Sequence, residues 1–228
     1  MKLFINIIAF ILFANYSNGQ VVDNVNFAVS SHPMKVNKVE YLSNQTKVEI
    51  SIENQIQNGN FCADKNIDIV DVISKKKFHL IKADGIPVCP SNYQFTSIGE
   101  VLTFTLIFPV ISPKPKYINI IENCNQYCFS IKGIILSREL NNEINLAYDY
   151  YSKSKLDFAL QAFKQIVENN TDYPFGNLYF NIIQILAEKQ DFTNAKTWFS
   201  KLKNSTFQDK NEVIARLENQ SYYQKLVL

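Results

Sequence analysis

The chain has 228 residues, and 46% of them are hydrophobic. Its 23 Lys and Arg residues nearly balance its 21 Asp and Glu residues, so the formal net charge at pH 7 is +2. This apolar content argues against a disordered chain and is typical of a globular protein with a buried core. The balanced charge leaves no basic excess for neutralising phosphates, so we expect no nucleic-acid partner.

Residues 1–19 have the pattern of a cleavable secretion signal. An apolar run over 3–13 is long enough for a signal peptide but shorter than the roughly 20 residues of a membrane-spanning helix. Ser17 and Gly19 supply the small residues of a cleavage site, which predicts cleavage after Gly19. The alternative is an uncleaved N-terminal anchor. We therefore expect a secreted or periplasmic protein with no transmembrane segment in its mature part, residues 20–228.

From about residue 25 to residue 136, apolar and polar residues alternate, as in the segment 47–53. A period of two predicts strands of an antiparallel sheet with one buried face. The expected strands are 34–42, 47–53, 67–73, 77–83, 101–108, 117–122 and 127–136. Turn segments rich in Gly, Pro and Asn separate them. Residues 20–136 are therefore expected to form an antiparallel β-sandwich of immunoglobulin-like type, although the tryptophan typical of immunoglobulin domains is absent.

Two segments of this half carry a family resemblance. Residues 77–87 read KFHLIKADGIP and residues 99–109 read GEVLTFTLIFP. Together with INIIE at 118–122 and GIIL at 133–136, they resemble a β-domain found in uncharacterised bacterial secreted proteins. The resemblance covers about 110 residues. It implies the fold and the export of this half, and it assigns no functional site.

The four cysteines all lie in the first half, at Cys62, Cys89, Cys124 and Cys128. An even number of cysteines in an exported protein favours disulfides. We expect Cys62 to pair with Cys89 and Cys124 with Cys128, because the members of each pair are neighbours in sequence. Free thiols, zinc and a redox couple are the alternatives. The last two are less favoured, because the Cys-x3-Cys spacing has no second pair and no nearby His.

After residue 136 the apolar residues recur at helical spacing. The expected helices cover 139–152, 156–169, 175–188, 192–203 and 209–225. Pro174 would stand at the start of the third helix, where its missing N–H costs least. Asp191 and Asp209 are the predicted N-caps of the fourth and fifth helices.

The helical half contains an internal repeat. Ala159 and Phe163 recur 36 residues later as Ala195 and Phe199. This spacing resembles that of the tetratricopeptide repeat, a unit of 34 residues that forms two paired helices. The resemblance implies that residues 137–228 form an all-α domain of two repeat units and a capping helix. The expected fold is thus an α+β multidomain protein, with the β-sandwich first and the helical repeats second.

In tetratricopeptide arrays the first helix of each pair lines a concave face that binds extended peptides. Carried onto this sequence, the resemblance implies a partner-binding groove formed by Asn141, Ile144, Tyr148, Tyr151, Asn177, Phe180, Gln184 and Glu188. Tyrosine and asparagine suit peptide recognition, because they combine contact area with hydrogen bonding. The alternative interpretation is that Tyr148 and Tyr151 pack against the β-domain, or that Ile144 closes the helical core.

No residue pattern indicates catalysis. The only histidines, His32 and His79, are predicted to face solvent. Asp64, Asp68 and Asp71 lack the spacing and the glycine of a calcium loop. No phosphate-binding loop, nucleophile elbow or zinc-protease motif is present. We therefore expect no enzymatic activity, no cofactor and no metal site.

The leading hypothesis is a non-enzymatic, exported interaction or scaffold protein that binds a protein partner through the helical groove. The alternative is a carbohydrate- or cell-surface-binding module that acts through the β-sandwich. Such a module needs aromatic side chains exposed on a sheet face, and Tyr93, Phe95 and Tyr117 are its candidates.

Overall fold

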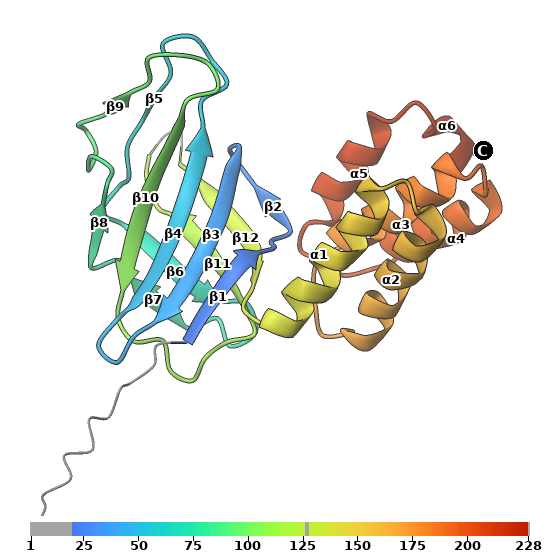
Figure 1. Cartoon of the computed structure of the whole chain (residues 1–228), viewed down its shortest axis with the longest axis horizontal. Coiled ribbons are helices and arrows are strands. Elements are labelled where there is room, and N and C mark those ends of the chain that lie inside the picture. The colour runs from blue at the N-terminus through green and yellow to red at the C-terminus, as the bar shows by residue number, and fades with distance from the viewer. Residues whose placement is uncertain (1–19, 126–127, 228) are drawn as a thin grey trace, which may run out of the picture.

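A computed structural model of the chain describes residues 20–125 and 128–227. The predicted secretion signal and its cleavage site after Gly19 lie outside the described residues. All strands precede all helices, and the strand half and the helical half lie side by side (Figure 1). The predicted order, a β half followed by an α half, is confirmed.

The β half contains two five-stranded antiparallel sheets and one short ribbon. The first sheet has, in spatial order, β1 (Gln20–Val25), β3 (Met34–Tyr41), β4 (Thr46–Glu53), β10 (Val101–Phe108) and β8 (Lys82–Asp84). The second has β2 (Val29–Ser30), β12 (Ser130–Ile135), β11 (Tyr117–Glu122), β6 (Ile67–Asp71) and β7 (Lys77–His79). The ribbon pairs β5 (Asn60–Phe61) with β9 (Tyr93–Gln94).

The sheets share a hydrophobic core built by the predicted alternation. In β4 and β10, every second side chain is buried, and Ile50 lies opposite Phe104 in the register. The second sheet contributes Ile69 and Ile120 to the same cluster. The intervening polar side chains of β4 remain on the outer face, as expected for a half-buried sheet.

The segment 77–83, predicted as one strand, is two strands in different sheets. The backbone N–H of Leu80 donates to Ile67 O in the second sheet, whereas the N–H of Ile81 donates to Ile107 O in the first. The chain therefore crosses from one sheet to the other within two residues. Because apolar and polar residues alternate without a break across this point, the sequence pattern does not reveal the crossing. Strand β1 also begins earlier than the predicted β region, since its pairing with β3 starts at Gln20.

The helices are α1 (Arg138–Ser152), α2 (Leu156–Asn169), α3 (Asn177–Glu188), α4 (Phe192–Lys203), α5 (Lys210–Glu218) and α6 (Gln224–Val227). The ranges of α2 and α4 are as predicted. The predicted helix 209–225 is divided into α5 and α6 by a turn. Helix α3 has Gly176 as its N-cap, so Pro174 precedes the helix and does not begin it.

One predicted N-cap is confirmed and one has another role. The Asp191 side chain accepts a hydrogen bond from Asn194 N, as an N-cap does. Asp209 occupies the N-cap position of α5, but its side chain makes no capping bond. Its Oδ1 instead accepts from Gly176 N at 2.6 Å, so this buried carboxylate joins the start of α5 to the start of α3.

The helical half packs against the outer side of the second sheet through a buried seam. Tyr117 and Ile135 of this sheet belong to the hydrophobic cluster of the helices. Tyr173 and Phe175, from the segment between α2 and α3, extend the seam, and the Tyr117 and Tyr173 rings are 5.0 Å apart. At Gly133, φ is +71° and the backbone lies so close to Phe175 that a side chain there would collide with its ring. This contact is consistent with a fixed attachment of the two halves.

Candidate functional site

The first turns of α1 and α3 join the helices to the β half. Asn141 is fully buried, and its Oδ1 accepts from Asn26 N at 2.7 Å. Asn177 is also buried, and its Nδ2 donates to Phe27 O at 3.5 Å. Both asparagines were predicted to line a groove, but they contact the segment between β1 and β2 instead. The β half therefore covers one end of the face that α1 and α3 share.

Two apolar side chains of the predicted groove are also covered. Phe180 is buried, and the Arg216 guanidinium lies over its ring at 4.1 Å from the centroid. Ile144 is buried in the helical core. Both residues lie beneath the surface of this face, and Arg216 covers the ring of Phe180.

Polar side chains in the C-terminal parts of α1 and α3 are partly exposed. Tyr148 is 39% exposed, although its ring packs edge-on against Phe163 at 5.2 Å. Its hydroxyl accepts from Asn181 Nδ2 at 2.9 Å, which links α1 to α3. These two contacts join Tyr148 to residues of the helices.

One turn further on, Tyr151 makes a second link between the same helices. Its hydroxyl donates to Glu188 Oε1 and accepts from Gln184 Nε2 at 2.8 Å. Burial, and then the Glu188 carboxylate, raise the pKa of Tyr151 to about 12, so the hydroxyl keeps its proton at neutral pH. We call Tyr148, Tyr151, Asn181, Gln184, Glu188 and Arg216 the helical polar face.

Sequence reasoning missed Asn181, Arg216 and a neighbouring tyrosine, Tyr222. The Tyr222 hydroxyl is buried and has no hydrogen-bond partner among the described residues. Burial raises the pKa of Tyr222 to about 12, and Glu188 adds to this increase. The segment 211–226 was assigned only a capping role, so its side chains were not considered. A buried hydroxyl without a hydrogen-bond partner is uncommon in proteins.

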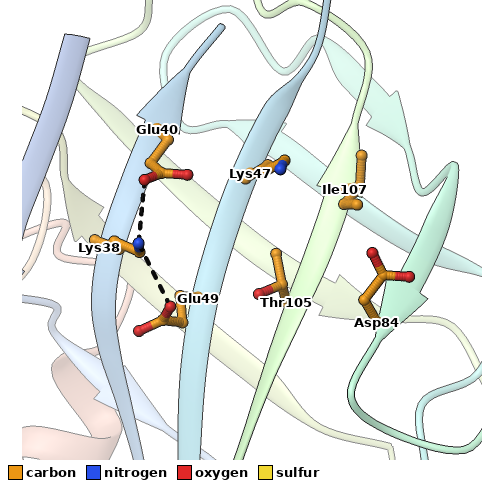
Figure 2. A pocket seen from close by; sticks show the side chains of 7 residues that line it. All are labelled: Lys38, Glu40, Lys47, Glu49, Asp84, Thr105 and Ile107. Carbon is orange, nitrogen blue, oxygen red and sulfur yellow. Dashed lines mark hydrogen bonds and ion pairs between the residues drawn. The ribbon is translucent and has the colours of Figure 1, made fainter. Parts of the chain in front are cut away.

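The outer face of the first sheet carries a different feature, a shallow hollow of about 200 Å³ (Figure 2). Lys38 Nζ lies 3.1 Å from Glu40 and 3.6 Å from Glu49 on the neighbouring strand. The hydrogen bond and charge of Glu40 raise the pKa of Lys38. Such cross-strand ion pairs on an exposed sheet face are screened by solvent and contribute little. The hollow is therefore a solvated sheet surface on which Lys38 is paired with two glutamates.

The aromatic residues proposed for a carbohydrate-binding sheet face do not form one. Phe95 and Tyr117 are buried, and the Tyr93 hydroxyl is used in a hydrogen bond of 2.7 Å to Glu100. The three side chains therefore present no exposed aromatic platform. Their alternation with polar neighbours is equally compatible with burial, because burial depends on which side the rest of the fold covers.

The histidines differ from each other. His32 was expected in solvent, but it is half-buried, with its ring edge-on to Phe61 at 5.8 Å. Burial lowers the pKa of His32, so its ring is neutral at pH 7. His79 is exposed and forms a hydrogen bond to Asp68.

Both predicted disulfides are present, Cys62–Cys89 and Cys124–Cys128. Within residues 20–125 and 128–227, no three His, Cys, Asp or Glu side chains are grouped as a metal ion would need. In the same part of the chain, no helix is long and apolar enough to cross a membrane.

Comparison of the chain with models of known protein families gives no match, and neither does comparison with curated protein sequences.

Proposed function

We propose that this chain is an exported, non-enzymatic interaction protein, and that its helical polar face binds an extended segment of a protein partner. The observation that carries the proposal is the open row of hydrogen-bonding side chains between α1 and α3. Tyr148, Tyr151 and Gln184 form this row, and the unsatisfied Tyr222 hydroxyl lies beside it.

The chemistry of the helical polar face suits a peptide backbone. Its tyrosines offer apolar ring area with a hydroxyl tip, and its amides can both donate and accept hydrogen bonds. One carboxylate, Glu188, and one guanidinium, Arg216, leave the face without net charge. We therefore propose a partner segment of mixed polar and apolar residues, recognised mainly by hydrogen bonds and aromatic contact.

A tetratricopeptide-like arrangement of the helices supports this assignment. The repeated Ala159 and Ala195 are both buried, as are Phe163 and Phe199. Helices α1 and α3 are linked through their side chains, whereas α2 packs against both of them. On this proposal the β half is a sandwich that closes one end of the groove, and its two disulfides fit an oxidising compartment outside the cytoplasm.

The test uses the mature chain, residues 20–228, as bait for exported proteins of the source organism. The groove variant combines Tyr148→Ala with Gln184→Ala. The control combines Gln161→Ala with Lys164→Ala, on the outer surface of α2. Phe180→Ala is unsuitable, since Phe180 is buried and its loss would disturb the packing.

A captured protein is then purified, and its Kd is measured by calorimetry. We expect the groove variant to weaken binding by about tenfold or more, the effect of losing one interface anchor of about 1.4 kcal/mol or more. The control should bind as the native protein does. Equal binding by the groove variant and the native protein would refute the assignment. Binding to a glycan array that survives in the groove variant would favour the carbohydrate alternative.

A further inference from the structure

A cleft of about 900 Å³ lies in the β half, lined by residues of the segment after β4, of β5 and of the loop before β9. Strands β5 and β9 stand at the end of the β half that is remote from the helices (Figure 1). This volume is that of a site for a small ligand or a few residues of a peptide. The lining comes from the segments after β4, around the Cys62–Cys89 disulfide and after β11.

The charged groups in the lining of the cleft are acidic, and the rest of the lining is largely apolar. It includes the carboxylates of Glu53, Asp64 and Glu122, and no Lys or Arg stands among the described residues that line it. His32, the only other titratable group in this lining, is held neutral because burial lowers its pKa. The amide side chains in the lining are Asn54, Gln55, Asn58, Asn60, Asn92 and Asn125. The cleft therefore has a negative charge and many neutral hydrogen-bonding groups.

Glu122 is the least expected of these residues. Alternation along β11 turns it to the same side as the core residues Ile118 and Ile120, and it is only 7% exposed. Its Oε1 accepts from Asp64 N at 2.7 Å, and its Oε2 accepts from Phe129 N at 2.9 Å. Each oxygen keeps a further lone pair, and no Lys or Arg is among the described residues that line the cleft around it. A carboxylate buried in this way is stabilised if a cation approaches it.

The walls of the cleft are held in place. The Cys62–Cys89 disulfide joins two of its segments, and the Asn54 side chain donates to Ser97 O at 2.7 Å. Gly59 O accepts from both Phe95 N and the Gln94 side chain. The site is therefore preformed, and ligand binding would cost little conformational entropy in the segments that line the cleft.

From the cleft, its carboxylates, which no Lys or Arg of the described lining neutralises, and its rigid walls, we propose that this end of the β half binds a ligand carrying a primary ammonium or guanidinium group. Glu122 receives the cationic nitrogen at the base of the cleft, together with Asp64. Glu53 and the amides contact the rest of the ligand. Two sources share this chemistry, namely a free polyamine and a Lys or Arg side chain of a peptide. The site is separate from the helical polar face, so it adds a second binding function to the protein.

The test titrates the mature chain by calorimetry with three probes. Spermidine represents the polyamine source, and an acetylated, amidated tetrapeptide with one Lys represents the peptide source. The same tetrapeptide with norleucine in place of Lys is the neutral control. The variants are Glu122→Gln and Asp64→Asn in the cleft. A third cleft variant, Glu53→Gln, lies on the exposed rim and is included in case substitution of the buried Glu122 impairs folding. Glu40→Gln, in the hollow on the outer sheet face, makes the same change of charge away from the cleft.

We expect saturable binding of at least one cationic probe and none of the norleucine peptide. Each cleft variant that folds should weaken binding by about tenfold or more, because a hydrogen bond to a charged group is lost. Glu40→Gln should change the affinity by less than about twofold. Binding of only one cationic probe identifies the source. Absence of binding by both, or equal losses in Glu40→Gln and in the cleft variants, would overturn the proposal.

Discussion

Asn141 and Asn26 are 115 residues apart in the chain, yet Asn141 Oδ1 accepts the backbone N–H of Asn26 at 2.7 Å. The Nδ2 of the same side chain donates to Ile135 O at 2.8 Å and to Ser137 O at 2.9 Å. One buried amide therefore satisfies backbone groups of the segment after β1, of β12 and of the N-cap of α1. It is a main polar connection between the β half and the helices.

Asn141→Ala should destabilise the protein by about 1–3 kcal/mol. The change leaves the buried N–H of Asn26 and the buried carbonyl of Ile135 without their partner. Urea unfolding of the mature chain, followed by circular dichroism, measures the effect. The matched control is Asn142→Ala, because Asn142 is the exposed neighbour on the same helix and should change stability by less than about 0.5 kcal/mol. Similar losses in both variants would contradict the role assigned to Asn141.

Gly99 and Gly133 both have a positive φ, but only Gly133 is closely surrounded by other atoms. Replacing each of them with Ala therefore distinguishes the cost of backbone strain from the cost of a steric clash. At Gly99, φ is +83° and an added Cβ meets nothing within 4 Å, so Gly99→Ala should cost only the backbone term of about 1–2 kcal/mol. At Gly133, φ is +71° and the Cβ would lie 2.8 Å from Ala28 Cβ and 2.9 Å from Phe175. Gly133→Ala should cost about 1–3 kcal/mol more, because it overpacks the seam between the two halves. Thermal and urea unfolding would measure both costs, and equal costs would argue against a tight seam.

The two disulfides should differ in their contribution to stability. The cysteines of Cys62–Cys89 are 27 residues apart, and those of Cys124–Cys128 are 4 apart. Loop-closure entropy then gives about 3.5 kcal/mol for the first bond and about 2 kcal/mol for the second. Guanidinium unfolding of the two double Cys→Ala variants without reductant measures the difference. In the native protein, thiol labelling under denaturing, non-reducing conditions should detect no free cysteine, and detection of four would contradict both bonds.

Asp209 and Asp191 should give opposite pH dependences of stability. Burial raises the pKa of Asp209, so the folded protein holds this proton more tightly than the unfolded chain. The resulting stabilisation is present below the unfolded pKa of 3.8 and is lost as the pH rises through the folded pKa. Hydrogen bonds from Asn194 lower the pKa of Asp191, so its stabilisation is present above 3.8 and is lost as the pH falls through the folded pKa.

The measurement is urea unfolding between pH 3 and pH 6 for Asp209→Asn, Asp191→Asn and the native protein. Relative to the native protein, Asp209→Asn should become more stable as the pH rises, whereas Asp191→Asn should become less stable. If the stability difference from the native protein changed with pH in the same direction for both variants, the pKa of at least one of the two carboxylates would not be shifted in the direction stated above.

Local patterns accounted for much of the fold. The alternation of Val48, Ile50 and Ile52 indicated β4 and its buried face, because the backbone geometry of a strand turns every second side chain the same way. The helical spacing predicted α2 and α4 with their observed bounds. The proximity of the cysteines in sequence indicated their pairing.

Other features depend on contacts between distant segments. Leu80 and Ile81 continue one alternating run, but their hydrogen bonds lie in different sheets. Asn141 and Tyr148 are on the same helix and were assigned to the same groove. Asn141 is buried at the junction, whereas Tyr148 remains open.

The sequence by itself determined the order of the halves, most element boundaries and the disulfide pairs, because each depends on residues close together in the chain. Only the tertiary structure decided which side chains are available for binding. It turned Asn141 and Asn177 to the β half, left the helical polar face partly exposed and placed Glu122 in the lining of a cleft. Exposure depends on what packs against a residue, and here the packing segments are often more than 50 residues away.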